Sequence, residues 1–220
     1  MATIITIDGP SGVGKGTIAQ LLAQTFGYAL LDSGALYRLT AVNAMRLGLN
    51  PDDESEAAQA VKDLSVDFRD GKVFLHGIDV TKTIREERTG QVASRVAVHP
   101  VVRQGLFDFM HAFVREPGIV ADGRDMGTVV FPNADLKLFL TASADIRAQR
   151  RYKQLRSNGK DVNLDTVFFE LNERDKRDSS RSAAPLEPAK DAVIIDTGEL
   201  GVLQVFEKVK AVAASRGIVP

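Results

Sequence analysis

The sequence predicts an α/β fold in which helices flank a five-stranded parallel sheet. Short apolar runs alternate with segments of helical periodicity, which is the pattern of a mostly parallel sheet. The expected strands are Thr3–Asp8, Tyr28–Asp32, Gly118–Gly123, Leu136–Ala142 and Ala192–Thr197. After the first strand, apolar residues recur at helical spacing and Gly27 follows the last of them, which predicts a helix that ends there. The residues at this spacing are Ile18, Leu21, Leu22, Thr25 and Phe26.

Residues 66–80 interrupt the alternation with a pattern typical of antiparallel strands. Apolar residues alternate with polar ones around Asp70-Gly71, a strong signal for a hairpin turn. The alternating residues are Val66, Phe68, Val73 and Leu75. Helical patterns precede and follow the hairpin, in residues 51–64 and 92–114. We therefore expect a β-containing insertion, at about residues 37–114, in a core of sheet and helices.

A second segment, Ser143 to Arg181, is polar and dense in arginine. The dipeptide Asn158-Gly159 divides it into two helical patterns, so this segment is suited to form a hinged helical lid. The expected boundaries are about residues 151–179 for the lid, and about residues 1–36, 115–150 and 180–220 for the core.

Charge and composition narrow the possible partners. The formal net charge is -1, so no global field attracts nucleic acid or an anionic membrane. The absence of cysteine excludes disulfides and Cys-ligated metal, and it fits a reducing cytosol. The N-terminus lacks the pattern of a signal peptide, and no apolar run approaches the length of about 18 residues that spans a bilayer. We expect a cytoplasmic monomer that acts on small molecules, with neither nucleic acid nor membrane as a partner.

The stretch DGPSGVGKGT, Asp8 to Thr17, predicts a phosphate-binding loop. Gly9, Gly14 and Lys15 fit the P-loop pattern G-x-x-x-x-G-K-[ST], and the stretch lies between a predicted strand and helix. Backbone N–H groups of such a loop bind phosphate, and Lys15 would neutralise charge on the β and γ phosphates. A Gly-rich turn without a ligand is the alternative. The residues expected to bind ATP are Gly9, Pro10, Ser11, Gly12, Val13, Gly14, Lys15, Gly16 and Thr17.

The position of the loop hydroxyl distinguishes classes of P-loop enzymes. Gly16 stands where Ser or Thr is expected and Thr17 follows one position later, a spacing that resembles the loop of nucleoside monophosphate kinases. With the hydroxyl displaced, the Mg²⁺ that accompanies ATP should depend on waters, phosphate oxygens and a carboxylate from another strand. Asp122, at the end of the third strand, is placed to hold Mg²⁺, mostly through water. Its alternative role is to cap its loop.

Grouped arginines predict a second anion site, because the planar guanidinium binds phosphate bidentately. Transfer between phosphates needs little acid–base chemistry, so we interpret His76, His99 and His111 as structural or exposed. Surface ion pairs are the alternative for the groups on helices, and Ser33 could be an N-cap. The groups are Asp32, Ser33, Tyr37 and Arg38 after the second strand; Asp122, Arg124 and Asp125 after the third; and two helix faces, Arg147, Arg150 and Arg151, and Arg174, Asp178 and Arg181.

Four stretches resemble the bacterial cytidylate kinase family over nearly the whole chain. They are ITIDGPSGVGKGT, LLDSGALYR, ADGRDMGTVVFP and ERDKRDSSRSAAPL, in the order and spacing of that family. The second and third are far more specific than the first, which many nucleotide kinases share. The resemblance implies direct in-line phosphoryl transfer from ATP to CMP and dCMP, with Mg²⁺ as cofactor. It also implies that the β-containing insertion binds the monophosphate.

The same resemblance implies roles for individual residues. Ser94, Arg103 and Asp125 match positions that read the cytosine edge, and an Asp that accepts from the N4 amino group is the pairing expected from donor–acceptor geometry. Arg38 and Arg124 match contacts to the acceptor phosphate. The whole set expected to bind CMP is Ser33, Tyr37, Arg38, Ser94, Arg103, Asp122, Arg124, Asp125, Arg174, Asp178 and Arg181. The residues expected to serve catalysis are Lys15, Arg124, Arg150, Arg151 and Arg181, with Arg147, Arg150 and Arg151 belonging to the lid over ATP.

Three other functions compete with this interpretation. The nearest is a P-loop kinase that acts on UMP, AMP or a non-nucleotide. A nucleotide-dependent switch would need a hydroxyl directly after Lys15, where Gly16 stands. A nucleic-acid-binding module is disfavoured by the charge balance and by the absence of an aromatic-rich basic stripe.

Overall fold

The chain forms two units, each with its own sheet. In the computed structural model, which describes residues 1–69 and 72–219, Met1–Leu31 and Phe113–Pro220 make the larger unit and Asp32–Ala112 the smaller one.

The larger unit is built on a five-stranded sheet with the strand order β2-β6-β1-β7-β8. The strands are β1 (Thr3–Asp8), β2 (Ala29–Asp32), β6 (Gly118–Asp122), β7 (Leu136–Thr141) and β8 (Val193–Asp196). β1 pairs in parallel with β6 and β7, and β7 pairs in parallel with β8. Long buried runs in β1, β6 and β7 show why these segments read as continuous apolar stretches. The predicted five-stranded parallel sheet is confirmed.

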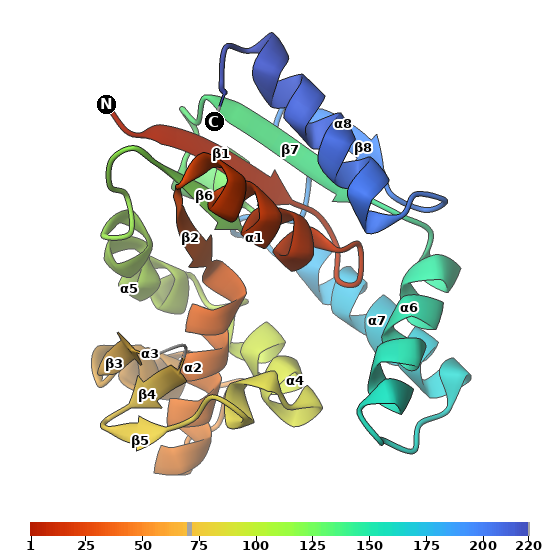
Figure 1. Cartoon of the computed structure of the whole chain (residues 1–220). Helices are drawn as coiled ribbons and strands as arrows, with labels where there is room; N and C mark the ends of the chain where they lie inside the picture. Colours follow the sequence, from red (N-terminus) through yellow and green to blue (C-terminus); the bar gives the residue numbers. More distant parts are fainter. Residues whose placement is uncertain (70–71, 220) are drawn as a thin grey trace. The chain divides into compact units, whose positions relative to one another are not determined.

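Two helices, α1 (Lys15–Phe26) and α8 (Val202–Ser215), lie side by side on one face of this sheet (Figure 1). Their apolar residues share a core with β1 and β7; its members include Ile5, Ile7, Ile18, Leu22, Leu138, Val205 and Val209. Thr25 shares the helical spacing of the apolar residues, but it is exposed. The small residues Ala19 and Ala23 are buried instead, which permits close packing on the sheet.

The arginine-rich segment forms two packed helices, α6 (Ala144–Ser157) and α7 (Leu164–Ser179). The predicted break is confirmed: Asn158 caps α6 and Gly159 follows with a φ of 74°. The two helices bury a small core of their own, consisting of Ala148, Leu155, Val167 and Leu171. Because α7 ends at Ser179, the prediction that Arg181 shares its helical face is wrong.

The smaller unit combines helices with a three-stranded antiparallel sheet of order β3-β4-β5. Its elements are α2 (Ser33–Leu47), α3 (Glu54–Lys62), β3 (Val66–Arg69), β4 (Lys72–Leu75), β5 (Ile78–Asp79), the 3₁₀ turn η1 (Thr83–Arg85), α4 (Glu87–Val96) and α5 (Pro100–His111). The predicted hairpin is confirmed by β3 and β4, while its turn, Asp70-Gly71, lies outside the described residues. Pro100 stands in the first turn of α5 and divides the helical pattern of residues 92–114 in two.

The N-cap of α2 is Asp32, whose side chain accepts from the Ala35 N–H at 3.1 Å. The alternative that Ser33 caps this helix is therefore wrong. Ser33 is the first helical residue and is buried.

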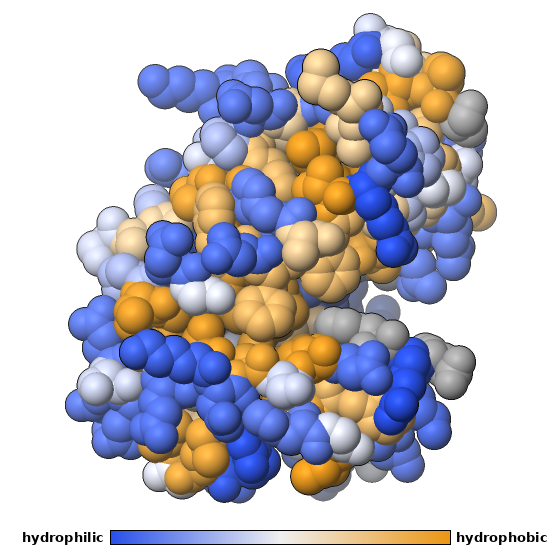
Figure 2. Space-filling model, turned by 90° about the vertical axis from the view of Figure 1, so that its left-hand side faces the viewer, coloured by the Kyte–Doolittle hydropathy of each residue, from blue (hydrophilic) through white to orange (hydrophobic). Residues whose placement is uncertain are grey.

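Polar and apolar residues are mixed on the surface. The face in Figure 2 shows hydrophobic and hydrophilic residues next to one another. Across the described residues, no helix has both the length and the apolar character that a bilayer crossing requires.

We expect Gly9→Ala to lower the free energy of unfolding by more than Gly27→Ala does. A Cβ at position 9 would lie 2.1 Å from the carbonyl oxygen of Leu140, and its φ of 141° is one that residues with a side chain rarely adopt. Gly27 has a φ of 67° but no atom within 4 Å of its Cβ position, so only conformational strain of about 1–2 kcal/mol applies there. Urea unfolding of both variants measures the difference. Equal losses would contradict the role given to the Leu140 contact.

Candidate active site

The P-loop leaves β1 at Gly9 and enters α1 at Lys15. Gly9, Gly12 and Gly14 have φ values of 141°, 85° and 94°, which glycine adopts at little cost. Gly14 is the N-cap of α1 and has no side chain that could bind the first N–H groups of the helix. These N–H groups and the positive end of the helix dipole therefore suit an anion.

The P-loop is held from two sides by other elements of the larger unit. Arg147, in α6, donates to the carbonyl oxygens of Ser11 at 3.2 Å and Ala142 at 3.1 Å. The hydroxyl of Thr197, just after β8, donates to the carbonyl oxygen of Val13 at 3.2 Å. Both contacts fix backbone carbonyls, and fixed carbonyls orient the N–H groups of the loop. Neither role was visible in the sequence.

Lys15 is buried, with 6% of its surface exposed. Its Nζ donates to the carbonyl oxygen of Pro10 at 2.9 Å. Burial, and then the positive charge of Arg124, lower the pKa of this amine from an ordinary value of 10.5 to about 7, although Asp122 acts in the opposite direction. A bound anion would restore the charge on Lys15.

Three arginines surround the carboxylate of Asp178, near the end of α7. Arg124 Nε donates to Asp178 Oδ2 at 3.1 Å, and Arg174 Nε lies 4.0 Å from the same oxygen. Arg181 reaches Oδ1 from the loop that follows α7. Burial opposes the charge of Asp178, but the guanidinium groups hold its pKa below the usual range. Three guanidinium groups around one carboxylate leave positive charge available for phosphate.

The end of β6 and the loop after it carry three of the expected site residues. Asp122 ends the strand, and its Oδ2 lies 3.4 Å from the position that a Cβ on Gly16 would occupy, so it faces the P-loop. Arg124 follows with the contacts described above. Asp125 is buried and precedes a π-helical turn, η2 (Met126–Val130). Asp8, the last residue of β1, accepts hydrogen bonds from the N–H groups of this turn.

Asp122 fits the modest protein contribution that Mg²⁺ requires. This ion commonly keeps several waters and takes one or two carboxylates together with substrate phosphates. Among residues 1–69 and 72–219, no cluster of three or more acidic or histidine side chains is arranged to hold a metal. A carboxylate that faces the phosphate loop, as Asp122 does, is the kind of ligand that such a metal takes.

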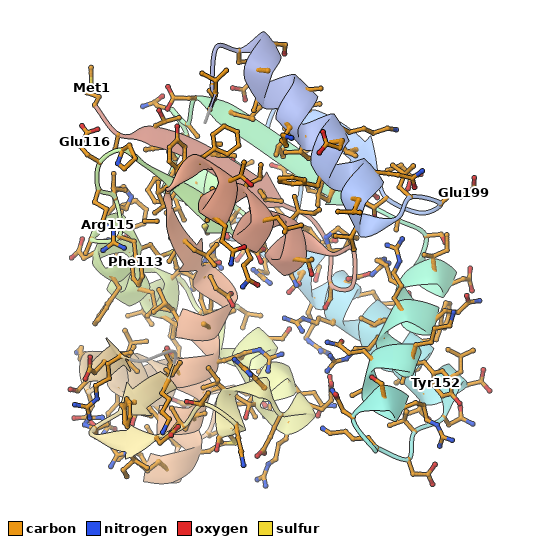
Figure 3. The ribbon with its side chains drawn as sticks, in the orientation of Figure 1. Met1, Phe113, Arg115, Glu116, Tyr152 and Glu199 are labelled. Carbon is orange, nitrogen blue, oxygen red and sulfur yellow. The ribbon has the colours of Figure 1, made fainter. Side chains whose placement is uncertain are left out.

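The arginines of α6 have different partners. Arg147 is buried and forms an ion pair of 2.6 Å with Asp175 of α7. Arg150 donates to the hydroxyl of Thr197 at 3.1 Å and to the carbonyl oxygen of Gly198 at 3.2 Å, in the loop that also carries Glu199, labelled in Figure 3. Arg151 donates to Gln154 Oε1 at 2.8 Å. The alternative of simple surface ion pairs is therefore wrong for Arg147 and Arg150.

The remaining expected residues lie in the smaller unit. The guanidinium of Arg103 stands over the ring of Tyr37, 5.6 Å from its centroid, which is a cation–π distance. Arg38 Nη1 donates to the carbonyl oxygens of Ile84 at 2.7 Å and Glu86 at 3.0 Å. Ser33 and Ser94 are buried. In this unit, the structure thus brings Tyr37 and Arg103 into contact.

The chain matches the family model described as cytidylate kinase over residues 5–215. It belongs to the cytidylate kinase family. Cytidylate kinases of Paraburkholderia phytofirmans and Shewanella denitrificans are each 52% identical to it, over 94% of this chain and 90% and 93% of their own lengths. The cytidylate kinase of Pseudomonas savastanoi pv. phaseolicola is 51% identical, over 99% of this chain and 97% of its own. The resemblance predicted from the motifs is confirmed.

Likeness to solved structures supports the fold alone. An uncharacterized protein from Eubacterium ventriosum superimposes with a TM-score of 0.55 at 15% identity, over 98% of this chain and 99% of the other. Structural similarity at this level of identity is evidence for the architecture that this family member shares, not for its substrate.

We expect ATP binding to take up a proton at about pH 8. The Lys15 amine, with a pKa of about 7, is mostly neutral there in the free protein, and a polyphosphate favours its charged form. ATP affinity should therefore fall as the pH rises above about 7. Calorimetry at about pH 8, above the phosphate pKa of about 6, in buffers of different ionisation enthalpy measures the uptake. Wild-type uptake equal to that of Lys15→Met would contradict the assignment to Lys15.

Arg150→Ala should lower the melting temperature more than Arg151→Ala. The first change removes hydrogen bonds from a charged donor to Thr197 and Gly198, each of about 1.5–3 kcal/mol. The second removes one bond to a neighbouring side chain on the same helix, a contact of the kind that contributes about 1 kcal/mol or less. Thermal unfolding followed by circular dichroism compares the two. Similar melting temperatures would show that the Arg150 contacts add little to stability.

Proposed function

We propose that this protein transfers the γ-phosphoryl group of ATP to CMP and dCMP by direct in-line attack, forming CDP and dCDP. The observation that carries the proposal is the buried Lys15 beside Arg124, in the unit that also holds the P-loop and the arginines around Asp178. Membership of the cytidylate kinase family supports the choice of substrates.

The P-loop, residues 9–17, is the proposed ATP site. Its positive-φ glycines and the uncapped start of α1 suit a triphosphate, and Lys15 would pair with the β and γ phosphates. Residues 151–179 are the proposed lid, with Arg150 and Arg151 at its base. Lid closure would exclude water, which competes with CMP as the acceptor.

The residues proposed for the acceptor site are those that the resemblance to cytidylate kinases implies. Arg38 and Arg124 would hold the phosphate of CMP, and Tyr37 and Ser33 would form the pocket wall. Ser94, Arg103 and Asp125 would read the cytosine edge. Residues 37–114 would then be the monophosphate-binding insertion, and Arg174, Asp178 and Arg181 would share contacts to ribose, phosphate or base.

The chemistry needs positioning and charge stabilisation more than proton transfer. The attacking oxygen of a monophosphate is already ionised, so no general base is required. Lys15, Arg124 and Arg181 would stabilise the charge that spreads over the transferring group. Mg²⁺, held by Asp122 mostly through water, would supply further neutralisation of phosphate charge when it is bound with ATP.

The proposal includes a monomer in the cytoplasm, and the absence of cysteine fits that reducing compartment. The nearest rival is a kinase of the same fold that prefers UMP or AMP. The bases differ in the hydrogen-bond donors and acceptors at their edges. The choice between the proposal and this rival therefore depends on which base edge Asp125 can bind.

An ADP-release assay across CMP, dCMP, UMP and AMP tests the proposal. Cytosine offers an N4 amino donor where uracil offers an oxygen, and an ionised Asp125 can only accept. Mismatched polar groups cost about 1–3 kcal/mol, so kcat/KM should favour CMP over UMP by at least about tenfold.

Asp125→Asn should lose activity on CMP and narrow the gap between CMP and UMP. Its amide keeps an acceptor for cytosine and adds a donor for the uracil oxygen. The measurement is kcat/KM for both nucleotides with both proteins. If both values fall by the same factor, Asp125 anchors its turn and base selection lies elsewhere.

A further inference from the structure

We propose that Asp8 is a positioning residue for Asp125 and thereby contributes to base selection without contacting the base. The inference rests on the proposed role of Asp125 at the cytosine edge. Asp8 is the last residue of β1 and directly precedes the P-loop, whereas Lys15 stands where the P-loop enters α1.

Asp8 binds the two backbone groups that directly follow Asp125. Its Oδ1 accepts from the Met126 N–H at 2.8 Å, and its Oδ2 accepts from the Gly127 N–H at 2.8 Å. One carboxylate therefore uses both oxygens on consecutive N–H groups, an arrangement that leaves little freedom to either peptide plane.

The peptide group between Asp125 and Met126 is fixed at both ends. Its N–H binds Asp8, while its carbonyl oxygen accepts from the N–H groups of Val129 at 2.9 Å and Val130 at 3.2 Å. The Cα of Asp125 is part of this peptide plane, so these bonds restrict the direction in which its side chain leaves the backbone. Loss of the Asp8 contacts would allow the Asp125 side chain to take other orientations.

The turn also lies close against β1. A Cβ on Gly127 would come within 2.8 Å of the hydroxyl of Thr6, so the backbone at Gly127 approaches the strand as only glycine can. Asp8 is the next residue on the strand with a side chain directed to this turn. The same residue precedes Gly9, where the P-loop begins.

Burial of a carboxylate costs free energy, which argues against a role for Asp8 in packing alone. It is 4% exposed, and burial raises the pKa of its carboxyl from 3.8 to about 6, with a further contribution from the charge of Asp125. The N–H groups of Gly127 and Met126 act in the opposite direction. A buried acid next to a second acid is tolerated here because it satisfies two donors at once.

Asp8→Asn tests the inference by the ratio of kcat/KM for CMP to that for UMP. The amide oxygen can accept from one N–H, but the amide nitrogen then faces the other donor, so the turn must shift. We expect the ratio to fall by about fivefold, the size of effect that one lost hydrogen bond produces. A purely structural role would lower the melting temperature and leave the ratio unchanged.

Asp135→Asn is the matched control. Asp135 Oδ2 accepts from the Ile4 N–H at 2.8 Å, so it is also a carboxylate bonded to backbone, but it lies at the other end of β1 and is exposed. The ratio of kcat/KM for CMP to that for UMP in Asp135→Asn should equal the ratio in the wild type. If Asp135→Asn changes the ratio as much as Asp8→Asn does, the effect is a general one and the inference is overturned.

The double variant Asp8→Asn/Asp125→Asn separates this inference from the proposed function. If Asp8 acts through Asp125, its substitution has no further effect on the ratio once Asp125 is replaced. An unchanged ratio in Asp125→Asn alone rejects the proposed role of Asp125. A narrowed ratio in Asp125→Asn, with Asp8→Asn like the wild type, rejects the role of Asp8 only.

Asp8→Ser provides a second variant in case the asparagine does not fold. Serine retains one acceptor and places no nitrogen opposite a donor, so it removes one bond with less conflict. The ratio should again fall. If neither variant folds, Asp8 is a folding residue and the inference is overturned.

Discussion

Burial of positive charge beside the P-loop is the constraint on which the rest of the site depends. Lys15 is enclosed near Arg124, and its low pKa reflects first the loss of water and then the neighbouring guanidinium. In the free protein this arrangement opposes the charge on Lys15. A phosphate chain that enters the loop would provide a negative charge beside Lys15. Relief of the unfavourable burial of positive charge would then contribute to the affinity for nucleotide.

The acidic residues of the larger unit make this concentration of cations possible. Asp178 gathers three arginines, and Asp175 pairs with Arg147. In each case the carboxylate fixes where a guanidinium lies rather than cancelling the positive charge of the whole group. Arg147 is an example of the result: it reaches Asp175 on one side and the Ser11 carbonyl on the other, so a contact in α7 is connected to the phosphate loop.

Local patterns allowed much of the fold to be predicted from the sequence. The strands, the hairpin and the break at Asn158-Gly159 follow from apolar runs and turn residues that are neighbours in the chain. The differences concern features that depend on distant parts. Thr25 fitted the helical period but is exposed, and Arg181 fitted the spacing of α7 but follows its end.

The same distinction holds for the candidate site. The P-loop and the arginine groups are visible as motifs, whereas the contacts of Arg147, Thr197 and Asp8 join residues far apart in sequence. No spacing rule predicts those contacts. Asp8 is part of the P-loop stretch, yet its partners are more than a hundred residues away, in the turn η2 that follows β6.

The low pKa of Lys15 also has a consequence for covalent chemistry. At neutral pH a large share of this side chain is a free amine, whereas exposed lysines with a pKa of about 10.4 remain ammonium ions. A free amine is the form that attacks a carbonyl carbon and forms a Schiff base. A small aldehyde without phosphate would therefore label Lys15 in preference to the lysines of the surface, and bound ATP, which favours the ammonium form, would suppress the reaction.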